Sequence, residues 1–129
     1  MSRMAWIIAI LVCTSAPSAF AREYRAKVVR VVDGDTVEAD IELGFGFYRK
    51  AERIRLAGID APELTGISRP RGELSRNTLQ ALIEGRSVTL VTDDDQEDKY
   101  GRLLGVIRLG SQNINQEMVR QGQAVYRKY

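Results

Sequence analysis

The sequence predicts a small α+β protein in which a mixed, five-stranded β-barrel is accompanied by helices. Five short segments have the alternating or β-branched pattern of strands, and an amphipathic helical segment separates the third from the fourth. The chain has 129 residues, of which 44% are hydrophobic and 28% charged, and this composition is typical of one ordinary globular domain.

The first two strands are expected at residues 24–32 and 36–41. Both segments are rich in β-branched residues, and the Asp-Gly-Asp sequence at residues 33–35 between them is typical of a hairpin turn. Residues 44–46, Gly-Phe-Gly, then predict a loop, because glycine readily adopts the conformations that reverse the chain.

The third strand is expected at residues 53–59. Ile54 and Leu56 alternate with arginines and should face the core. Arg53 and Arg55 should therefore point outward and place two guanidinium groups on one surface. The proline that follows this segment ends the strand, because it cannot extend a central ladder.

An amphipathic helix is expected at residues 72–84, after a polar loop. Its apolar face consists of residues at helical spacing, namely Leu74, Thr78, Leu79, Leu82 and Ile83. Gly85 should end the helix, because glycine adopts the left-handed conformation that commonly follows a last helical turn.

Two further strands and a short helix complete the domain. The strands are expected at residues 87–92 and 102–109, with a charged loop between them, and the helix at residues 115–121. Asn113 should cap this helix and Gly122 should end it. Five strands with a helix between the third and the fourth give the order of a small Greek-key barrel of the oligonucleotide-binding type.

The first 21 residues are expected to lie outside this domain. Arg3 supplies a positive charge, residues 5–13 are an uninterrupted apolar run, and residues 19–21 read Ala-Phe-Ala. This order is typical of a secretory signal peptide, and the run is shorter than the about 20 residues of a spanning helix. We expect cleavage after residue 21, a mature domain at 22–129, no stable membrane association after cleavage, and a secreted or periplasmic location. A retained N-terminal anchor is the alternative.

The composition excludes several kinds of chemistry. The chain has no histidine and one cysteine, which excludes an imidazole general base, a Ser-His-Asp triad, a His-ligated zinc and a disulfide framework. An enzyme with this composition must use carboxylates, basic side chains, hydroxyls or a hard metal ion. The net charge is only +2, so that affinity for polyanions must come from local clusters of Arg and Lys.

Five residues at the turns could together carry such chemistry. Asp35 and Asp60 are hard oxygen ligands suited to Ca²⁺, and Arg55 and Arg102 suit phosphate oxygens. Glu63 could take a proton from water. This set is what metal-assisted phosphodiester hydrolysis without histidine requires. Taken singly, each segment is better explained as a hairpin turn or a salt-bridged surface loop, and only the combination points to this chemistry.

The sequence resembles the staphylococcal nuclease (thermonuclease) family of secreted, calcium-dependent nucleases. Four motifs carry the resemblance: VVDGDTV at residues 31–37, IRLAGIDAPE at 54–63, DKYGR at 98–102 and VRQGQA at 119–124. They occur in the family's order and with similar separations. The resemblance implies a five-stranded OB-fold barrel that hydrolyses DNA and RNA, preferentially single-stranded or denatured, as a monomer, and leaves 3′-phosphate ends.

The resemblance also implies a role for each residue of the site. The carboxylates of Asp35 and Asp60 and the backbone carbonyl of Ala61 would hold Ca²⁺. Glu63 would be the general base for the attacking water.

Two arginines would hold the phosphate in the same scheme. Arg55 and Arg102 would clamp it and stabilise its added charge, with Lys99 and Tyr100 near the nucleotide as substrate-binding residues.

Two departures from the family pattern stand out. Ala61 replaces the threonine of the best-known member, which should matter little because only its carbonyl would touch the metal. The chain ends at Tyr129, where relatives usually continue into another helix, so that a C-terminal helix is expected to be missing. An alternative function is therefore a non-catalytic module, inactivated by truncation, that binds nucleic acid or protein. Residues 126–129, Tyr-Arg-Lys-Tyr, either line the nucleic-acid groove or form a polar tail.

Overall fold

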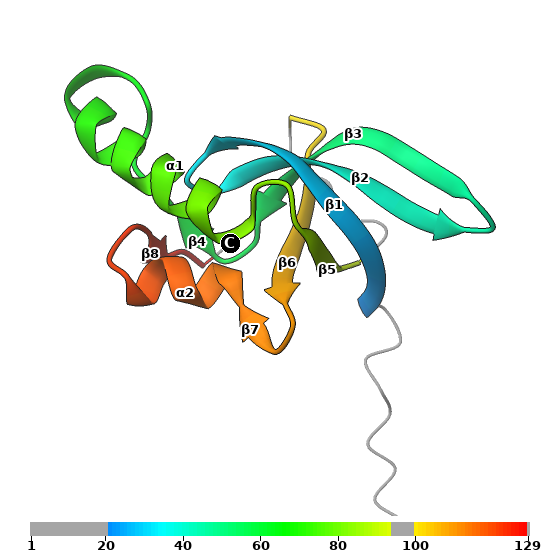
Figure 1. Ribbon diagram of the computed structural model, residues 1–129. Coiled ribbons are helices and arrows are strands. Elements are labelled where there is room, and N and C mark those ends of the chain that lie inside the picture. Colours follow the sequence, from blue (N-terminus) through cyan, green and yellow to red (C-terminus); the bar gives the residue numbers. More distant parts are fainter. Residues whose placement is uncertain (1–20, 94–99, 129) are drawn as a thin grey trace, which may run out of the picture.

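The computed structural model of the chain describes residues 21–93 and 100–128, and within them five strands close a mixed barrel (Figure 1). The strands are β1 (Ala21–Asp33), β2 (Thr36–Gly44), β3 (Phe47–Leu56), β5 (Ser87–Asp93) and β6 (Leu103–Leu109). They pair antiparallel in the order β3-β2-β1-β5-β6, and a short parallel pairing between β3 and β6 closes the barrel. The predicted five-stranded barrel with helices is confirmed.

The β2–β3 hairpin is longer than predicted. β2 continues to Gly44 and β3 begins at Phe47 rather than at residue 53, so that the predicted loop is a tight turn at the tip. Phe45 has a positive φ of 54° in this turn, between two glycines that also have positive φ. The strands extend because pairing satisfies main-chain groups that a loop would leave to water. Figure 1 shows the hairpin projecting away from the helices.

The third strand also ends earlier than predicted, at Leu56 rather than at residue 59. Gly58 has a φ of 76° and turns the chain into β4 (Ile59–Asp60). This short strand pairs antiparallel with β8 (Val125–Tyr126) in a separate sheet. The pairing brings the C-terminal segment beside the turn that follows β3.

The predicted first helix is α1 (Arg69–Ile83), preceded by the 3-10 turn η1 (Gly66–Ser68). It begins three residues earlier than predicted, because proline is tolerated in the first helical turn, where Pro70 lies. The predicted apolar face is partly wrong: Leu74 is exposed, whereas Gly72 and Ser75 are buried. The helix packs so closely on its neighbours that only small residues fit at these positions.

The second helix is α2 (Ile114–Arg120), and its predicted cap is confirmed. The Asn113 side chain accepts a hydrogen bond of 3.1 Å from the Gln116 N–H. Asn113 also belongs to the short strand β7 (Gln112–Asn113), which pairs with β6. The buried Asn115 side chain accepts a bond from the Ile107 N–H and donates to the Ala57 and Gly105 carbonyls. Asn115 thus ties α2 to the barrel.

The core lies inside the barrel and beneath both helices. It includes Val28, Val37, Ile54, Leu56, Leu90 and Ile107 from the strands, with Leu79, Ile83, Ile114 and Met118 from the helices. No helix among the described residues is long and apolar enough to cross a membrane.

Candidate nuclease site

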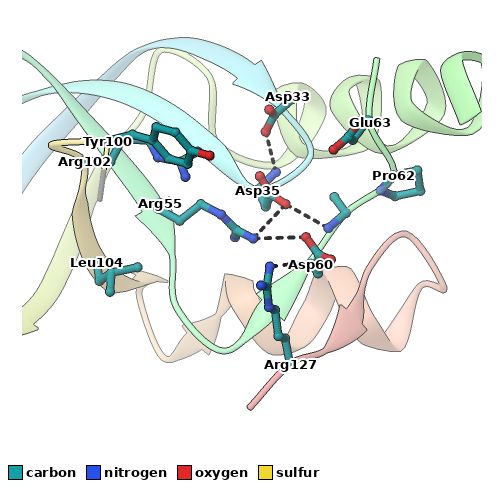
Figure 2. A pocket seen from close by; sticks show the side chains of 11 residues that line it. Asp33, Asp35, Arg55, Asp60, Pro62, Glu63, Tyr100, Arg102, Leu104 and Arg127 are labelled. Carbon is teal, nitrogen blue, oxygen red and sulfur yellow. Dashed lines mark hydrogen bonds and ion pairs between the residues drawn. The ribbon is translucent and has the colours of Figure 1, made fainter. Parts of the chain in front are cut away.

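A pocket of about 660 Å³ opens where the β1–β2 turn, the end of β3, β4 and the start of β6 meet (Figure 2). Four acidic and three basic side chains line it together with four other residues. The lining consists of Asp33, Asp35, Arg55, Asp60, Ala61, Pro62, Glu63, Tyr100, Arg102, Leu104 and Arg127. The structure thus brings together every predicted site residue except Lys99, which lies outside the described residues.

Asp35 is positioned by the predicted hairpin turn. Its N–H donates to the Asp33 side chain over 3.0 Å, and its carbonyl accepts a bond of 2.8 Å from the Leu56 N–H. Gly34 between the two acids packs against α1, where an added Cβ would collide with the Ser75 hydroxyl. Glycine is therefore required here by the close approach of the helix rather than by an unusual φ.

Arg55 corrects a prediction, because it is buried rather than exposed on an outer surface. Its Nη2 lies 3.2 Å from an oxygen of Asp35 and 3.2 Å from an oxygen of Asp60, and its Nη1 donates to the Leu56 carbonyl over 2.9 Å. The strand does alternate as predicted, but the two aspartates cover the face that the pattern assigns to solvent. Arg53 is exposed, so that the two arginines do not share an open surface.

The Asp35 carboxyl is buried and held by main-chain and side-chain donors. One oxygen accepts a bond of 2.8 Å from the Ala61 N–H, and the other accepts one of 3.2 Å from the Thr36 hydroxyl. Burial raises the pKa of Asp35 to about 6, helped by the neighbouring Asp33, and the Ala61 N–H and Arg55 only partly oppose this. A cation bound at this carboxyl would favour its ionised form.

Asp60 is the last residue of β4 and Glu63 follows three residues later, and both are exposed. One Asp60 oxygen contacts Arg55, and the other lies 3.9 Å from Arg127 Nη1. The Glu63 backbone carbonyl packs against Gly72 of α1, where an added Cβ would collide with it. The helix thus fixes the backbone of Glu63. Among the described residues, its carboxylate has no hydrogen-bond or ion-pair partner.

Arg102 and Tyr100 form the side of the pocket near β6 (Figure 2). Arg102 Nη1 donates to the Thr36 hydroxyl over 3.4 Å, and its guanidinium carbon lies 5.2 Å from the centre of the Tyr100 ring. An exposed aromatic ring beside a guanidinium suits a nucleobase and its phosphate.

The oxygen donors of the pocket fit a hard cation with few protein ligands. No three His, Cys, Asp or Glu side chains converge as a metal cluster among the described residues. The predicted ligands are the carboxylates of Asp35 and Asp60 and the Ala61 carbonyl, and water would have to complete the shell.

Two charged residues of the pocket are not among the predicted site residues. Asp33 was visible only as a turn residue, and it contributes to the raised pKa of Asp35. Arg127 belongs to a segment that was assigned either to a groove or to a tail. Its place in the pocket depends on the pairing of two strands of two residues each, which is too short to detect in a sequence pattern.

Known proteins are similar to the chain. A family model described as "Staphylococcal nuclease homologue" matches residues 53–129. An "Uncharacterized endonuclease" of Escherichia coli O157:H7 is 42% identical over 109 residues, which cover 83% of this chain and 64% of the relative. A "Thermonuclease" of Staphylococcus hyicus is 30% identical over 113 residues, covering 85% of this chain and 63% of the relative.

A third relative, "Micrococcal nuclease" of Shigella flexneri, is 35% identical over 131 residues, covering 94% of this chain and 68% of the relative. The chain therefore spans roughly two thirds of the length of the curated relatives it matches.

Proposed function

The chain belongs to the staphylococcal nuclease family, and from this premise we propose that it is a Ca²⁺-dependent nuclease that hydrolyses phosphodiester bonds of DNA and RNA. The observation that carries the proposal is Arg55, which is buried between Asp35 and Asp60 in a pocket that also holds Arg102 and Glu63. In this arrangement the guanidinium can bind an anionic phosphate, and the two carboxylates beside it can bind a cation.

Two arginines bind the phosphate in this proposal. The orientation of Arg55 is set by its bond to the Leu56 carbonyl and by the two aspartates. Its side chain therefore loses little conformational entropy when substrate binds. Arg102 has a long bond of 3.4 Å to the Thr36 hydroxyl, which a phosphate oxygen can replace. Together the two guanidiniums stabilise the negative charge that grows on the phosphate in the transition state.

Glu63 accepts the proton of the attacking water. Its carboxylate lines the pocket, and no partner among the described residues competes for it. When bound, Ca²⁺ held by Asp35, Asp60 and the Ala61 carbonyl supplies positive charge that orients and polarises the phosphate. The proton moves from water to a Glu63 oxygen while Arg55 and Arg102 hold the phosphate in place.

The substrate preference follows from the surface of the pocket. Tyr100 is exposed and can stack on a base, which a single or denatured strand offers and an intact duplex does not. Lys99 precedes Tyr100 in the chain and is assigned to the same nucleotide. We assign 3′-phosphate products by the family resemblance. We assign a monomeric state by the same resemblance.

We propose that the protein is exported, to the periplasm or the medium. The charged start, the apolar run and the Ala-Phe-Ala sequence within residues 1–21 support a cleaved signal peptide. Intact mass of the protein recovered from the cell envelope or medium tests this, because export with cleavage leaves an N-terminus at Arg22. Retention of the whole leader in the cytoplasm would overturn it.

The decisive experiment for the nuclease measures cleavage of denatured DNA and of RNA by the purified protein, with Ca²⁺ and then with excess chelator. The Glu63→Gln variant should lose about 10²- to 10⁴-fold in kcat, because the general base is removed while the shape of the side chain is kept. Glu52→Gln is the matched control, since Glu52 lies on β3 outside the pocket and pairs with Arg49.

Circular dichroism separates the outcomes of that experiment. Folded protein without metal-dependent cleavage of either nucleic acid would contradict the nuclease. If such protein still bound single-stranded DNA, the alternative of a non-catalytic binding module would replace it. Equal activity of Glu63→Gln and wild type would remove Glu63 from the mechanism.

A further inference from the structure

The C-terminal segment delivers a third arginine to the pocket. β8 pairs with β4 through Ile59 with Tyr126 and Asp60 with Val125, and the Arg127 N–H donates to the Gly58 carbonyl over 2.8 Å. These main-chain bonds fix the backbone of Arg127 beside β4, the strand that carries Asp60. The side chain then lines the pocket, with Nη1 at 3.9 Å from an Asp60 oxygen.

Arg127 differs from Arg55 in how accessible it is. The Arg55 side chain is 7% exposed and lies 3.2 Å from Asp60, whereas the Arg127 side chain is 55% exposed and lies 3.9 Å from the same carboxylate. The Arg127 guanidinium can therefore be reached by an anion that enters the pocket, while that of Arg55 is enclosed between Asp35 and Asp60.

The position of Arg127 is also different from that of the other two arginines. In Figure 2, Arg102 and Tyr100 lie on one side of Arg55, and Arg127 lies on another side, next to Asp60. The pocket of about 660 Å³ is in the range that holds a drug-sized ligand and is much larger than one phosphate needs. A strand whose scissile phosphate sits at Arg55 and Arg102 therefore has room to extend toward Arg127.

We infer that Arg127 binds the phosphate next to the scissile one, so that the site selects polynucleotides over esters that contain a single phosphate. This inference rests on the proposed nuclease function, because it takes the scissile phosphate to be at Arg55 and Arg102. Arginine suits the task, since its planar guanidinium matches two phosphate oxygens at once.

A purely positional role for Arg127 would have different consequences. If it only held Asp60, its loss would change cleavage of short and long substrates by the same factor. A residue that binds a neighbouring phosphate affects long substrates alone, acts mainly on KM, and adds to the salt dependence of binding. The two roles can therefore be separated.

The first experiment measures binding without cleavage. A fluorescent 12-nucleotide single-stranded DNA is titrated with wild type, Arg127→Ala and Arg127→Lys in chelator at several salt concentrations. Arg127→Ala should bind about tenfold more weakly at low salt, and the slope of log K against log salt should shrink by about 0.7. Arg127→Lys should keep most of the slope but lose part of the affinity, because it keeps the charge without the planar fork.

The second experiment compares substrates in Ca²⁺. Arg127→Ala should lose about tenfold in kcat/KM on the 12-nucleotide strand, mostly through KM, and less than about twofold on a dinucleotide with one phosphodiester. Arg108→Ala is the matched control, because Arg108 is an exposed arginine on β6 that does not line the pocket. Arg108→Ala should match wild type in the ratio of kcat/KM on the 12-nucleotide strand to that on the dinucleotide. It should also match wild type in the slope of log K against log salt.

The results distinguish failure of the inference from failure of the nuclease. An unchanged salt slope, or an equal loss on both substrates, would overturn the assignment of Arg127 to a phosphate. Arg127-dependent binding by a protein that cleaves nothing would support the phosphate contact and contradict the nuclease. If Arg127→Ala does not fold by circular dichroism, Arg127→Gln, which keeps most of the side-chain stem, replaces it under the same criteria.

Discussion

The two ends of the β2–β3 hairpin are formed by the same pair of strands but have opposite environments. At the pocket end, Thr36 pairs with Arg55 and Val37 with Ile54, and all four residues are buried. At the tip, the large apolar side chains are exposed, namely Leu43, Phe45, Phe47 and Tyr48. Figure 1 shows the tip reaching beyond the rest of the barrel. The pairing register shifts between Ala39 and Ile41 and again between Glu42 and Gly44, and the two ends also differ in their neighbours.

Closure of the barrel produces this difference. β3 pairs with β6 through residues 54–56 alone, so that the rest of β3 has β2 as its one neighbour among the described strands. At the closed end the turns before β2 and after β3 cover Arg55. The lesson is that one hairpin can supply a rigid, charged site at one end and an exposed surface at the other.

The pKa values of the carboxyl groups at the two ends are shifted in opposite directions. Burial raises the pKa of Asp35 at the pocket end to about 6. Toward the tip, a hydrogen bond from the Ala51 N–H, with help from Lys50, lowers the pKa of Asp40. Desolvation dominates where the hairpin is covered, and hydrogen bonding dominates where it is open.

The largest expected effect is the difference between Arg55→Ala and Arg53→Ala in unfolding free energy and in cleavage. Removing Arg55 leaves two carboxylates close together without their guanidinium, which should cost about 3 kcal/mol of unfolding free energy and abolish cleavage. Arg53 is exposed and lies 3.5 Å from Glu38, so its removal should cost less than about 1 kcal/mol. Urea unfolding in chelator and cleavage in Ca²⁺ measure both. Equal losses for the two variants would contradict the contrast between the ends.

The second expected effect is a pH dependence of the metal-free protein. The pKa of Asp35 is raised in the folded state from 3.8 to about 6, so folding favours the protonated form, and the stabilisation is lost as pH rises through this window. The unfolding free energy should fall by up to about 3 kcal/mol between about pH 4 and pH 7. Affinity for Ca²⁺ should rise over the same range, because the cation needs the ionised carboxylate.

The Asp35→Asn variant is the control for the pH prediction. Its unfolding free energy should lack the fall that is assigned to Asp35, because the amide does not titrate. Urea unfolding in chelator at intervals of pH measures both proteins. Identical profiles for the variant and the wild type would assign the pH dependence to other groups.

The smallest effect is expected at the tip. Phe45 has a φ of 54° and is fully exposed, so it carries backbone strain without burial. Phe45→Asn should stabilise the protein by about 0.5–1 kcal/mol, because asparagine tolerates this conformation better, and should leave cleavage of denatured DNA unchanged. Thermal unfolding and kcat/KM test this, and a loss of cleavage would show that the tip takes part in substrate binding.

Locally encoded features were predictable from the sequence. The Asp33-Gly34-Asp35 turn, the Asn113 cap and the left-handed Gly85 after α1 each depend on residues close together in the chain, and the structure has all three. The composition was equally informative, because a chain without histidine restricts the chemistry of any site to oxygen ligands, arginine and lysine.

Features that depend on distant neighbours were not predictable. Alternation assigned Arg55 to a surface, and the helical pattern assigned Leu74 to a buried face, but Arg55 is buried and Leu74 exposed. The predicted ends of these strands were wrong for the same reason, because pairing across the hairpin extends β2 and β3 beyond the segments with a clear pattern.

By itself, the sequence determined the order of the five barrel strands and two helices and the residue types available to the site, because backbone propensities and side-chain chemistry act over a few residues. Tertiary structure alone decided that Arg55 is buried between Asp35 and Asp60 and that Arg127 joins the pocket. These contacts join residues on strands and turns that meet only when the barrel closes and β8 pairs with β4. Burial and partner distance, which set the charge of the site, exist only in the folded chain.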